Sequence, residues 1–171
     1  QGAQATAVGV SAGRVAQNNY ATALGSAAGY NAQGSDATAV GRLAGEVAQG
    51  AQATAVGVSA GRVSQGINAI AIGREAGKTS QGDSAIAVGY RAGQNAQGAN
   101  SIILNASGVA FDSTTASSFH VKPVRGGNYA ASALAYTSTG EIVEETNMHF
   151  DTSGNVGIGT DNPTSNLHVV G

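Results

Sequence analysis

The chain opens with a sequence repeat whose period is sixteen residues. Each unit begins with glutamine, and the in-phase glutamines are Gln1, Gln17, Gln33, Gln49, Gln65, Gln81 and Gln97. Six units keep this phase without an insertion, whereas the seventh starts in register at Gln97 and then diverges. A fixed repeat this short is typical of a coil that stacks on copies of itself, because each unit buries its apolar face only against its neighbours. The period therefore predicts a solenoid.

Within each unit, glycines separate a four-residue segment of alternating pattern. Counting from the glutamine, positions 9 and 13 are always Gly, and position 2 is Gly except for Asn18. We expect all three positions to form corners with positive φ. Positions 5 to 8 read A-x-A-x, which predicts a short strand with two distinct faces. The glycines exclude a helix, and the absence of a heptad phase excludes a coiled coil. Six to seven coils spaced about 4.8 Å apart give a rod of about 30 Å.

The loss of the repeat divides the chain into three expected regions, all of them built from β-strands. Residues 1–105 should form the β-roll of six to seven coils. Residues 106–145 should form a β neck that ends in a hairpin, with its turn at residues 137–140. Residues 146–171 alternate turns with short strands, and we expect a linker region that leads to a C-terminal part missing from this chain.

Composition narrows the range of functions. The net charge is −2, so bulk electrostatics gives no reason to expect nucleic-acid binding. No run of eighteen apolar residues is present, and no membrane insertion is expected in this segment. The absence of Cys is compatible with a surface or extracellular protein. Because the chain has 26 Gly and abundant Ala, each coil buries little apolar surface and needs further coils, caps or partner chains.

Residues that carry chemistry are few and scattered. His120, His149 and His168 are isolated from one another in the sequence, so no metal site is expected. No nucleophile stands beside a base, and no glycine-rich loop leads into a helical pattern. We therefore expect no enzymatic activity and no cofactor. Asn105-Ala106-Ser107 matches the N-glycosylation motif, and whether Asn105 is glycosylated stays open.

The variable positions of the repeat predict a ligand-facing surface. Positions 3–4, 10–11 and 14–15 carry most of the side-chain diversity, and a constant frame with varied exposed residues is how solenoids present a binding surface. The candidate residues are Tyr20, Tyr30, Arg42, Arg74, Tyr90 and Arg91. They are expected to contact a glycan or a protein. The alternative is that these side chains only keep the surface soluble.

A second candidate surface is a seam between parallel copies of the chain. We expect the larger side chains of positions 6 and 8 to fill the roll, which leaves the alanines as a smooth outward stripe. The seam candidates are Ala5, Ala7, Ala21, Ala23, Ala37, Ala39, Ala53, Ala55, Ala69, Ala71, Ala85 and Ala87. Their small size would allow three rods to approach closely around an axis. The opposite orientation, with Ala inside and Val or Ile at the seam, stays open.

Three regions of the chain resemble known fibre proteins. The motifs A-T-A-V-G-x-x-A-G and A-I-A-I-G-x-x-A, within residues 1–105, resemble the YadA-like head repeats of trimeric autotransporter adhesins, although the unit here is slightly longer. The segments S-I-I-L-N, S-S-F-H-V-K-P-V-R and L-A-Y-T-S-T-G-E-I are similar to fibre-like proteins of large DNA viruses of algae. The segment G-N-V-G-I-G-T-D-N-P-T-S-N-L-H-V is similar to a linker strand of phage tail fibres.

These resemblances imply a left-handed parallel β-roll in a parallel homotrimer. The implied function is a non-enzymatic adhesin or attachment fibre, located outside the cell on a virion or cell surface, which presents the roll to a host-surface glycan or protein. One alternative is a bacterial trimeric autotransporter-type adhesin. Another is a passive spacer whose binding domain lies elsewhere. The least favoured alternatives are an enzyme and an ice-binding protein. The stacked threonines of position 6 suggest the latter.

Overall fold

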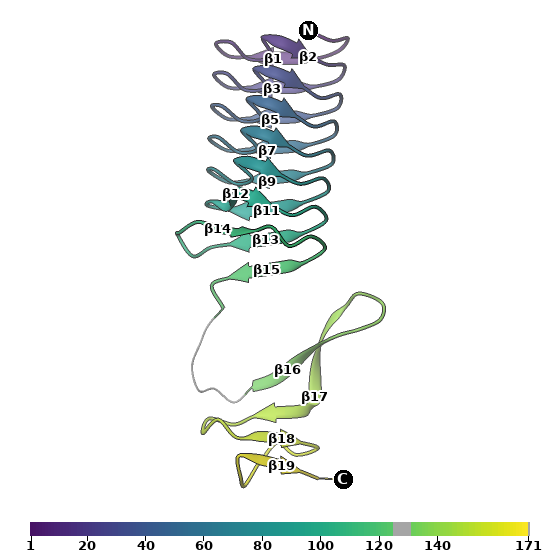
Figure 1. Ribbon diagram of the computed structural model, residues 1–171, viewed down its shortest axis with the longest axis vertical. Coiled ribbons are helices and arrows are strands. Elements are labelled where there is room, and N and C mark those ends of the chain that lie inside the picture. The colour runs from purple at the N-terminus through teal and green to yellow at the C-terminus, as the bar shows by residue number, and fades with distance from the viewer. Residues whose placement is uncertain (125–130, 171) are drawn as a thin grey trace. The chain divides into compact units, whose positions relative to one another are not determined.

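The computed structural model describes residues 1–124 and 131–170. The chain divides into two compact units, Gln1–Val124 and Arg125–Gly171. All regular secondary structure in the described residues is β-strand. The first unit is a stack of parallel coils (Figure 1), in which each strand pairs with its equivalent one coil away. The predicted all-β class and the predicted parallel solenoid of sixteen-residue coils are therefore confirmed.

Two parallel sheets form the walls of the roll. Sheet A contains eight strands in chain order, namely β1 (Thr6–Val8), β3 (Thr22–Leu24), β5 (Thr38–Val40), β7 (Thr54–Val56), β9 (Ile70–Ile72), β11 (Ile86–Gly89), β13 (Ile102–Asn105) and β15 (Phe119–Lys122). Sheet B contains seven strands, namely β2 (Val15–Gln17), β4 (Asn31–Gln33), β6 (Val47–Gln49), β8 (Val63–Gln65), β10 (Thr79–Gln81), β12 (Ala92–Gln97) and β14 (Phe111–Ser113). The register follows the repeat, as Ala39 pairs with Ala23 and with Ala55.

The roll extends beyond its predicted end at residue 105. Strands β14 and β15 continue sheets B and A, so the part of the predicted neck up to Lys122 belongs to the roll. Ile102 pairs with Phe119, one residue later than the period requires. The pairing of β12 with β14 also contains a register shift. The decay of the repeat after Gln97 thus marks an irregular last part of the roll and not its end.

Alanine lines the interior, which reverses the predicted orientation of the sheet A strands. In the inner coils the alanines of positions 5, 7 and 12 have no exposed surface, as at Ala37, Ala39 and Ala44. The predicted interior residues of position 8 face outward instead, and Val8 and Leu24 are 56% and 47% exposed.

The predicted alanine seam is therefore wrong. The residues buried inside a single chain are Ala21, Ala23, Ala37, Ala39, Ala53, Ala55, Ala69, Ala71, Ala85 and Ala87. Ala5 is half-buried and Ala7 is exposed, because the structure places a coil on only one side of them. Alanines enclosed between the two sheets of one chain cannot form a contact between chains.

The narrow space between the two sheets explains this orientation. A Cβ added to Gly45, at position 13, would lie 2.6 Å from Oε1 of Gln49. A Cβ added to Gly13 would lie 3.2 Å from the Cβ of Ala7. In the coils that keep the repeat, the glutamines and the alanine methyl groups therefore already fill the interior, and a Val or Leu side chain would overpack it. The larger side chains of each strand must face outward there. In the diverging seventh coil the interior accepts Ile103, which has no exposed surface and pairs with Ala87.

The corners of the coils follow the prediction at two of the three glycine positions. The glycines of position 13 have φ between 51° and 57°, and Gly41, at position 9, has φ 125°. Gly34, at position 2, does not have positive φ, so that part of the prediction is wrong. A Cβ there would lie 2.4 Å from the backbone nitrogen of Ala51 in the next coil. Close approach of two backbones, and not left-handed geometry, favours glycine at position 2, which Asn18 alone replaces.

The second unit contains one four-stranded sheet. Its strands, in spatial order, are β16 (Ala131–Tyr136), β17 (Ile142–Phe150), β18 (Val156–Ile158) and β19 (Leu167–Val169). β16 and β17 pair antiparallel around the turn at residues 137–140, and β17 crosses the predicted boundary at residue 145. Large apolar side chains of this sheet are exposed, with Leu134 at 75% and Tyr136 at 76%. This short unit therefore leaves much of its apolar surface uncovered within the chain.

Candidate functional site

The outer face of sheet A presents two stacked rows of side chains. The row at position 6 contains Thr6, Thr22, Thr38, Thr54, Ile70 and Ile86, continued by Ile102 and Phe119. The row at position 8 contains Val8, Leu24, Val40, Val56, Ile72 and Val88, continued by Leu104 and Val121. Each side chain lies beside its equivalent in the next coil, as Val40 lies beside Val56. A contiguous apolar surface of this kind usually meets a partner.

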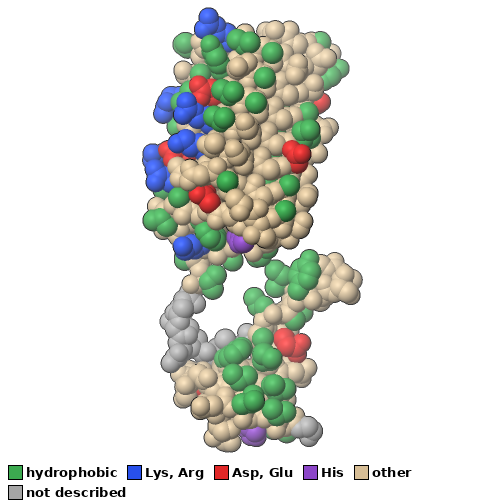
Figure 2. Space-filling model, viewed as in Figure 1, with side chains coloured by type: hydrophobic (Ala, Val, Ile, Leu, Met, Phe, Trp, Pro, Cys, Tyr) green, Lys and Arg blue, Asp and Glu red, His purple; other side chains and the backbone are tan. Residues whose placement is uncertain are grey.

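The turns that lead from sheet A to sheet B carry most of the positive charge of the chain. Six of its eight Lys and Arg residues lie in these turns, and we call them the cationic edge: Arg14, Arg42, Arg62, Arg74, Lys78 and Arg91. The same turns contain two acidic residues, Glu46 and Glu75. Figure 2 shows Lys and Arg side chains gathered along one side of the roll. The edge is therefore a strip of net positive charge on a chain whose net charge is −2.

Five of the six predicted ligand-facing residues lie in these turns. They are Tyr30, Arg42, Arg74, Tyr90 and Arg91. Tyr20 lies in the turn at the opposite edge, where it is 57% exposed. The structure brings three of the five together, because the Cζ atoms of Arg74 and Arg91 lie 5.4 Å and 4.9 Å from the ring centroid of Tyr90. These cation–π contacts hold the side chains in a defined cluster.

The carboxylate of Glu75 contacts both arginines of that cluster. It accepts hydrogen bonds from Nε of Arg91 at 2.9 Å and from Nε2 of Gln94 at 2.6 Å, and Nη2 of Arg74 lies 3.5 Å away. Burial would raise the pKa of Glu75, but the hydrogen bond from Arg91 and the charges of Lys78, Arg91 and Arg74 outweigh it and lower this pKa. Glu75 is therefore ionised at neutral pH and offsets part of the local positive charge.

A second contact between an arginine and a tyrosine lies nearer the start of the roll. The guanidinium of Arg14 lies 5.8 Å from the ring centroid of Tyr30, and its Nη1 donates to the tyrosine hydroxyl at 3.4 Å. Arg62 forms an ion pair with Glu46 at 2.5 Å. Within the described ranges, Arg14, Arg42 and Lys78 form no ion pair with a carboxylate. The cationic edge thus combines arginines that pair with a glutamate and cations that, in the described residues, do not.

The repeating glutamines, which sequence reasoning used only to mark the phase, form a buried ladder inside the roll. Gln49 is 2% exposed, and its Nε2 donates to the carbonyl oxygens of Thr38 at 2.9 Å and Ala53 at 3.3 Å. It also donates to Oε1 of Gln65 at 3.2 Å. The same pair of carbonyl contacts recurs at Gln17, Gln33, Gln65, Gln81 and Gln97. The signal for this role was a polar residue that never varies, in units whose other invariant positions are all alanine or glycine.

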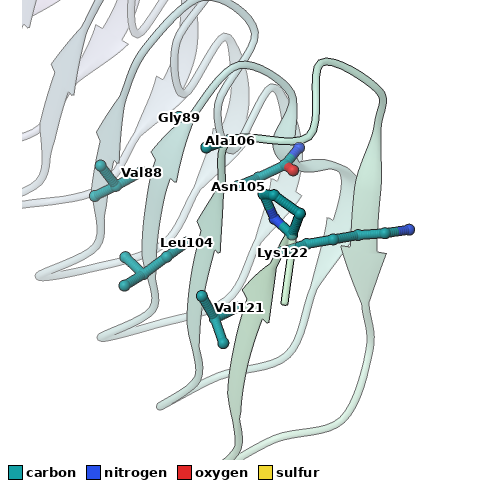
Figure 3. Close-up of a pocket in the computed structure, with 8 residues that line it drawn as sticks. Val88, Gly89, Leu104, Asn105, Ala106, Val121 and Lys122 are labelled. Carbon is teal, nitrogen blue, oxygen red and sulfur yellow. The ribbon is translucent and has the colours of Figure 1, made fainter. Parts of the chain in front are cut away.

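A cavity of about 370 Å³ lies at the C-terminal end of the outer face of sheet A. Its lining includes Val88, Leu104 and Val121, which Figure 3 shows stacked on one side, one from each successive strand. Lys122 extends toward the other side, where its Nζ lies 5.2 Å from the ring centroid of Phe111. The cavity therefore continues the apolar row of position 8 and gathers no cluster of reactive groups.

Asn105, the residue of the glycosylation motif, belongs to the interior. It is 3% exposed, and its Nδ2 donates to the carbonyl oxygens of Tyr90 at 2.8 Å and Val109 at 2.7 Å. Its Oδ1 accepts from the backbone nitrogen and the hydroxyl of Ser107 at 3.1 Å and 2.6 Å. A glycan on this nitrogen would displace these contacts. Asn105 therefore closes a turn of the fold and is not an attachment point in the folded chain.

The histidines do not gather into a reactive group. His120 Nε2 lies 2.8 Å from Oγ of Ser118, a contact that sequence reasoning missed. The same hydroxyl lies 2.7 Å from the carbonyl oxygen of Thr115, and the donor and acceptor in its contact with His120 depend on the imidazole tautomer. His149 and His168 lie on β17 and β19 of the second unit. Among the residues with described positions, no three His, Cys, Asp or Glu side chains are grouped to hold a metal.

Comparison of the chain with models of protein families, with curated proteins and with solved structures finds no match. In the described part of the chain, no helix is long and apolar enough to cross a membrane. The outer face of sheet A and the cationic edge are the two surfaces from which a function is inferred.

Proposed function

We propose that this chain is the rod of a non-enzymatic, homotrimeric surface fibre that attaches to a glycan or protein on a host surface. The observation that carries the proposal is the outer face of sheet A, where every coil of the roll presents an exposed or half-buried aliphatic side chain at position 8. Three parallel copies around an axis would cover three such faces at once, and each coil level would contribute the same residues to the contact. The seam of the proposed trimer is therefore this outer face and not the alanine rows.

The second unit supports the same assembly. Leu134, Tyr136 and Leu167 are 75%, 76% and 60% exposed there. A short unit buries little apolar surface by itself, and association with other chains is a common way to cover the rest. Both units of the chain thus leave apolar side chains that neighbouring copies would cover. The left-handed coil and the location on a virion or cell surface belong to the proposal through the resemblance to trimeric adhesins and viral fibres.

The cationic edge is the part of the rod to which we assign attachment. It lies in the turns between the sheets, so it is separate from the outer face of sheet A and stays accessible when that face is covered. Its variable side chains stand on a constant frame, which is how solenoids generate a recognition surface. A passive spacer would not require Tyr90 to lie against Arg74 and Arg91 in a defined cluster.

A glycan array and a cell-binding assay test this proposal. The oligomer of the wild-type chain should bind a defined set of glycans or a cell-surface protein. The variant Tyr90→Ala with Arg42→Ala, on the cationic edge, should lose this binding. Its matched control, Tyr20→Ala on the opposite edge, should keep it. If a folded oligomer binds nothing while a longer fibre without residues 1–96 still attaches to cells, the rod is only a spacer and the proposal is wrong.

A further inference from the structure

We infer that the cationic edge binds a linear acidic polysaccharide, with carboxylate or sulfate groups, laid along the stack of coils. This inference names the ligand class of the proposed attachment function and rests on that function. Its first support is charge segregation. The turns of the opposite edge, at residues 18–21, 34–37, 50–53, 66–69, 82–85 and 98–101, contain no Lys or Arg and hold Asp36 and Asp83. A surface selected only for solubility has no need to confine its Lys and Arg side chains to one edge.

The spacing of the cations fits a linear ligand. The six residues of the cationic edge are distributed over the first, third, fourth, fifth and sixth coils. Neighbouring parallel strands lie about 4.8 Å apart, so the five coil steps from Arg14 to Arg91 span about 24 Å. A small anion would reach one or two of these charges. A chain of acidic sugars parallel to the coil stack would meet them all.

The edge is also partly organised before it binds. Glu75 holds Arg91 and Arg74 through one nitrogen each, which leaves the other N–H groups of both guanidinium groups for a ligand. The side chain of Arg74 is 59% exposed and that of Arg91 is 35% exposed. Planar guanidinium groups bind carboxylate and sulfate-like groups in pairs of hydrogen bonds, and less entropy is lost when they are already held.

Two tyrosines make a polysaccharide a better match than a nucleic acid. Tyr30 lies beside Arg14, and Tyr90 lies beside Arg74 and Arg91, so each ring can pack on the apolar face of a sugar while the arginine binds its acidic group. The two rings are four coils apart. Single-stranded nucleic acids need closely spaced aromatic rings on which successive bases stack, and two distant rings do not supply that row.

The test measures binding to immobilised heparin, a sulfated polysaccharide that also carries carboxylates, with neutral dextran as the uncharged reference. Wild-type oligomer should bind heparin and not dextran, and high salt should release it. The variant Arg14→Ala, Arg42→Ala, Lys78→Ala should lose at least about tenfold in affinity. These three side chains form no ion pair in the described residues, so the variant should keep the fold.

A matched control changes the net charge equally at the opposite edge. Gln4→Asp, Gln52→Asp, Asn68→Asp places three acids at position 4, where Asp36 already has the same left-handed backbone. This variant should keep heparin binding within about twofold, because its new charges lie away from the edge. Equal losses in the two variants would show a bulk charge effect and overturn the inference.

Three further outcomes would also overturn it. Binding to DNA as tight as binding to heparin would contradict the assignment to a polysaccharide. An oligomer that attaches to cells but ignores heparin would refute the ligand class and leave the proposed attachment function intact. An oligomer that binds neither cells nor heparin would refute both.

Discussion

The two faces of sheet A are built from the same short strands but carry side chains of opposite size. In β5 the inner face is formed by Ala39, which has no exposed surface, and the outer face by the half-buried Thr38 and Val40. Globular cores usually take the larger aliphatic residue and leave the smaller one outside. In the coils that keep the repeat the order is reversed, because the glutamine ladder and the opposite sheet leave room only for methyl groups inside. In a roll this thin, size decides which residue is buried, and the larger apolar residues form the surface to which we assign the proposed trimer contact.

The contrast also bears on what holds the molecule together. Alanine buries little area, so the interior gains little from the hydrophobic effect. The stacking of the coils is stabilised instead by backbone hydrogen bonds between neighbouring strands and by the hydrogen bonds of the buried glutamine amides. The larger apolar side chains can contribute their full transfer free energy only when another chain covers them. Assembly and coil stability are thus assigned to different faces of the same strands.

The largest effect should come from enlarging an interior side chain. Ala39→Leu should lower the free energy of unfolding by about 3 kcal/mol, because the enclosed space cannot accept a larger group. Val40→Leu, on the outer face of the same strand, should change it by about 0.5 kcal/mol or less. Chemical denaturation of both variants at equal protein concentration measures the difference. Similar values for the two would mean that the faces are not distinct.

A smaller loss should follow from breaking the glutamine ladder. Gln49→Met keeps the length of the side chain but removes the donor to Thr38 and Ala53, and should lower the free energy of unfolding by about 2 kcal/mol. Gln52→Met, at an exposed position three residues later, is the matched control and should be nearly neutral. Thermal unfolding of the pair checks this. A neutral Gln49→Met would show that the ladder is incidental to stability.

The smallest effect concerns pH at the cationic edge. The pKa of Glu75 lies below its usual 4.5, so its ion pairs stabilise the folded chain at neutral pH and lose that contribution as pH falls below 4.5 through the lowered value. Glu75→Gln should therefore reduce the difference between the unfolding midpoints at pH 7 and pH 3. The comparison is with wild type, since other carboxylates titrate in both chains. An unchanged difference would mean that Glu75 contributes nothing to the pH dependence.

The architecture could be predicted because one sixteen-residue repeat corresponds to one coil. An unbroken period gave the coil length and parallel pairing, and the glycines of positions 9 and 13 gave two corners. The prediction for position 2 failed because a close approach between coils and a left-handed φ both select glycine. The end of the roll was missed because one extra residue before Phe119 breaks the period without breaking sheet A.

The orientation of the strands could not be predicted from the pattern alone. In A-x-A-x both alternating sets are compatible with a core, and the distance between the two sheets, which decides between them, is a property of the packed roll. Tyr20 was grouped with Tyr90 because both vary between units, but position 4 and position 10 belong to turns at opposite edges. Variability identified exposed residues, whereas only the path of the coil shows which of them share a surface.

The molecular mass of the chain in solution tests the central claim most directly. Analytical ultracentrifugation at micromolar concentration should give three times 16.7 kDa for wild type. Val40→Asp with Val56→Asp, on the outer face of sheet A, should give a folded species of 16.7 kDa. Ala48→Asp with Ser64→Asp places the same charges on exposed positions of sheet B and should leave the trimer intact. A monomeric wild type, or an outer-face variant that remains trimeric, would contradict the account.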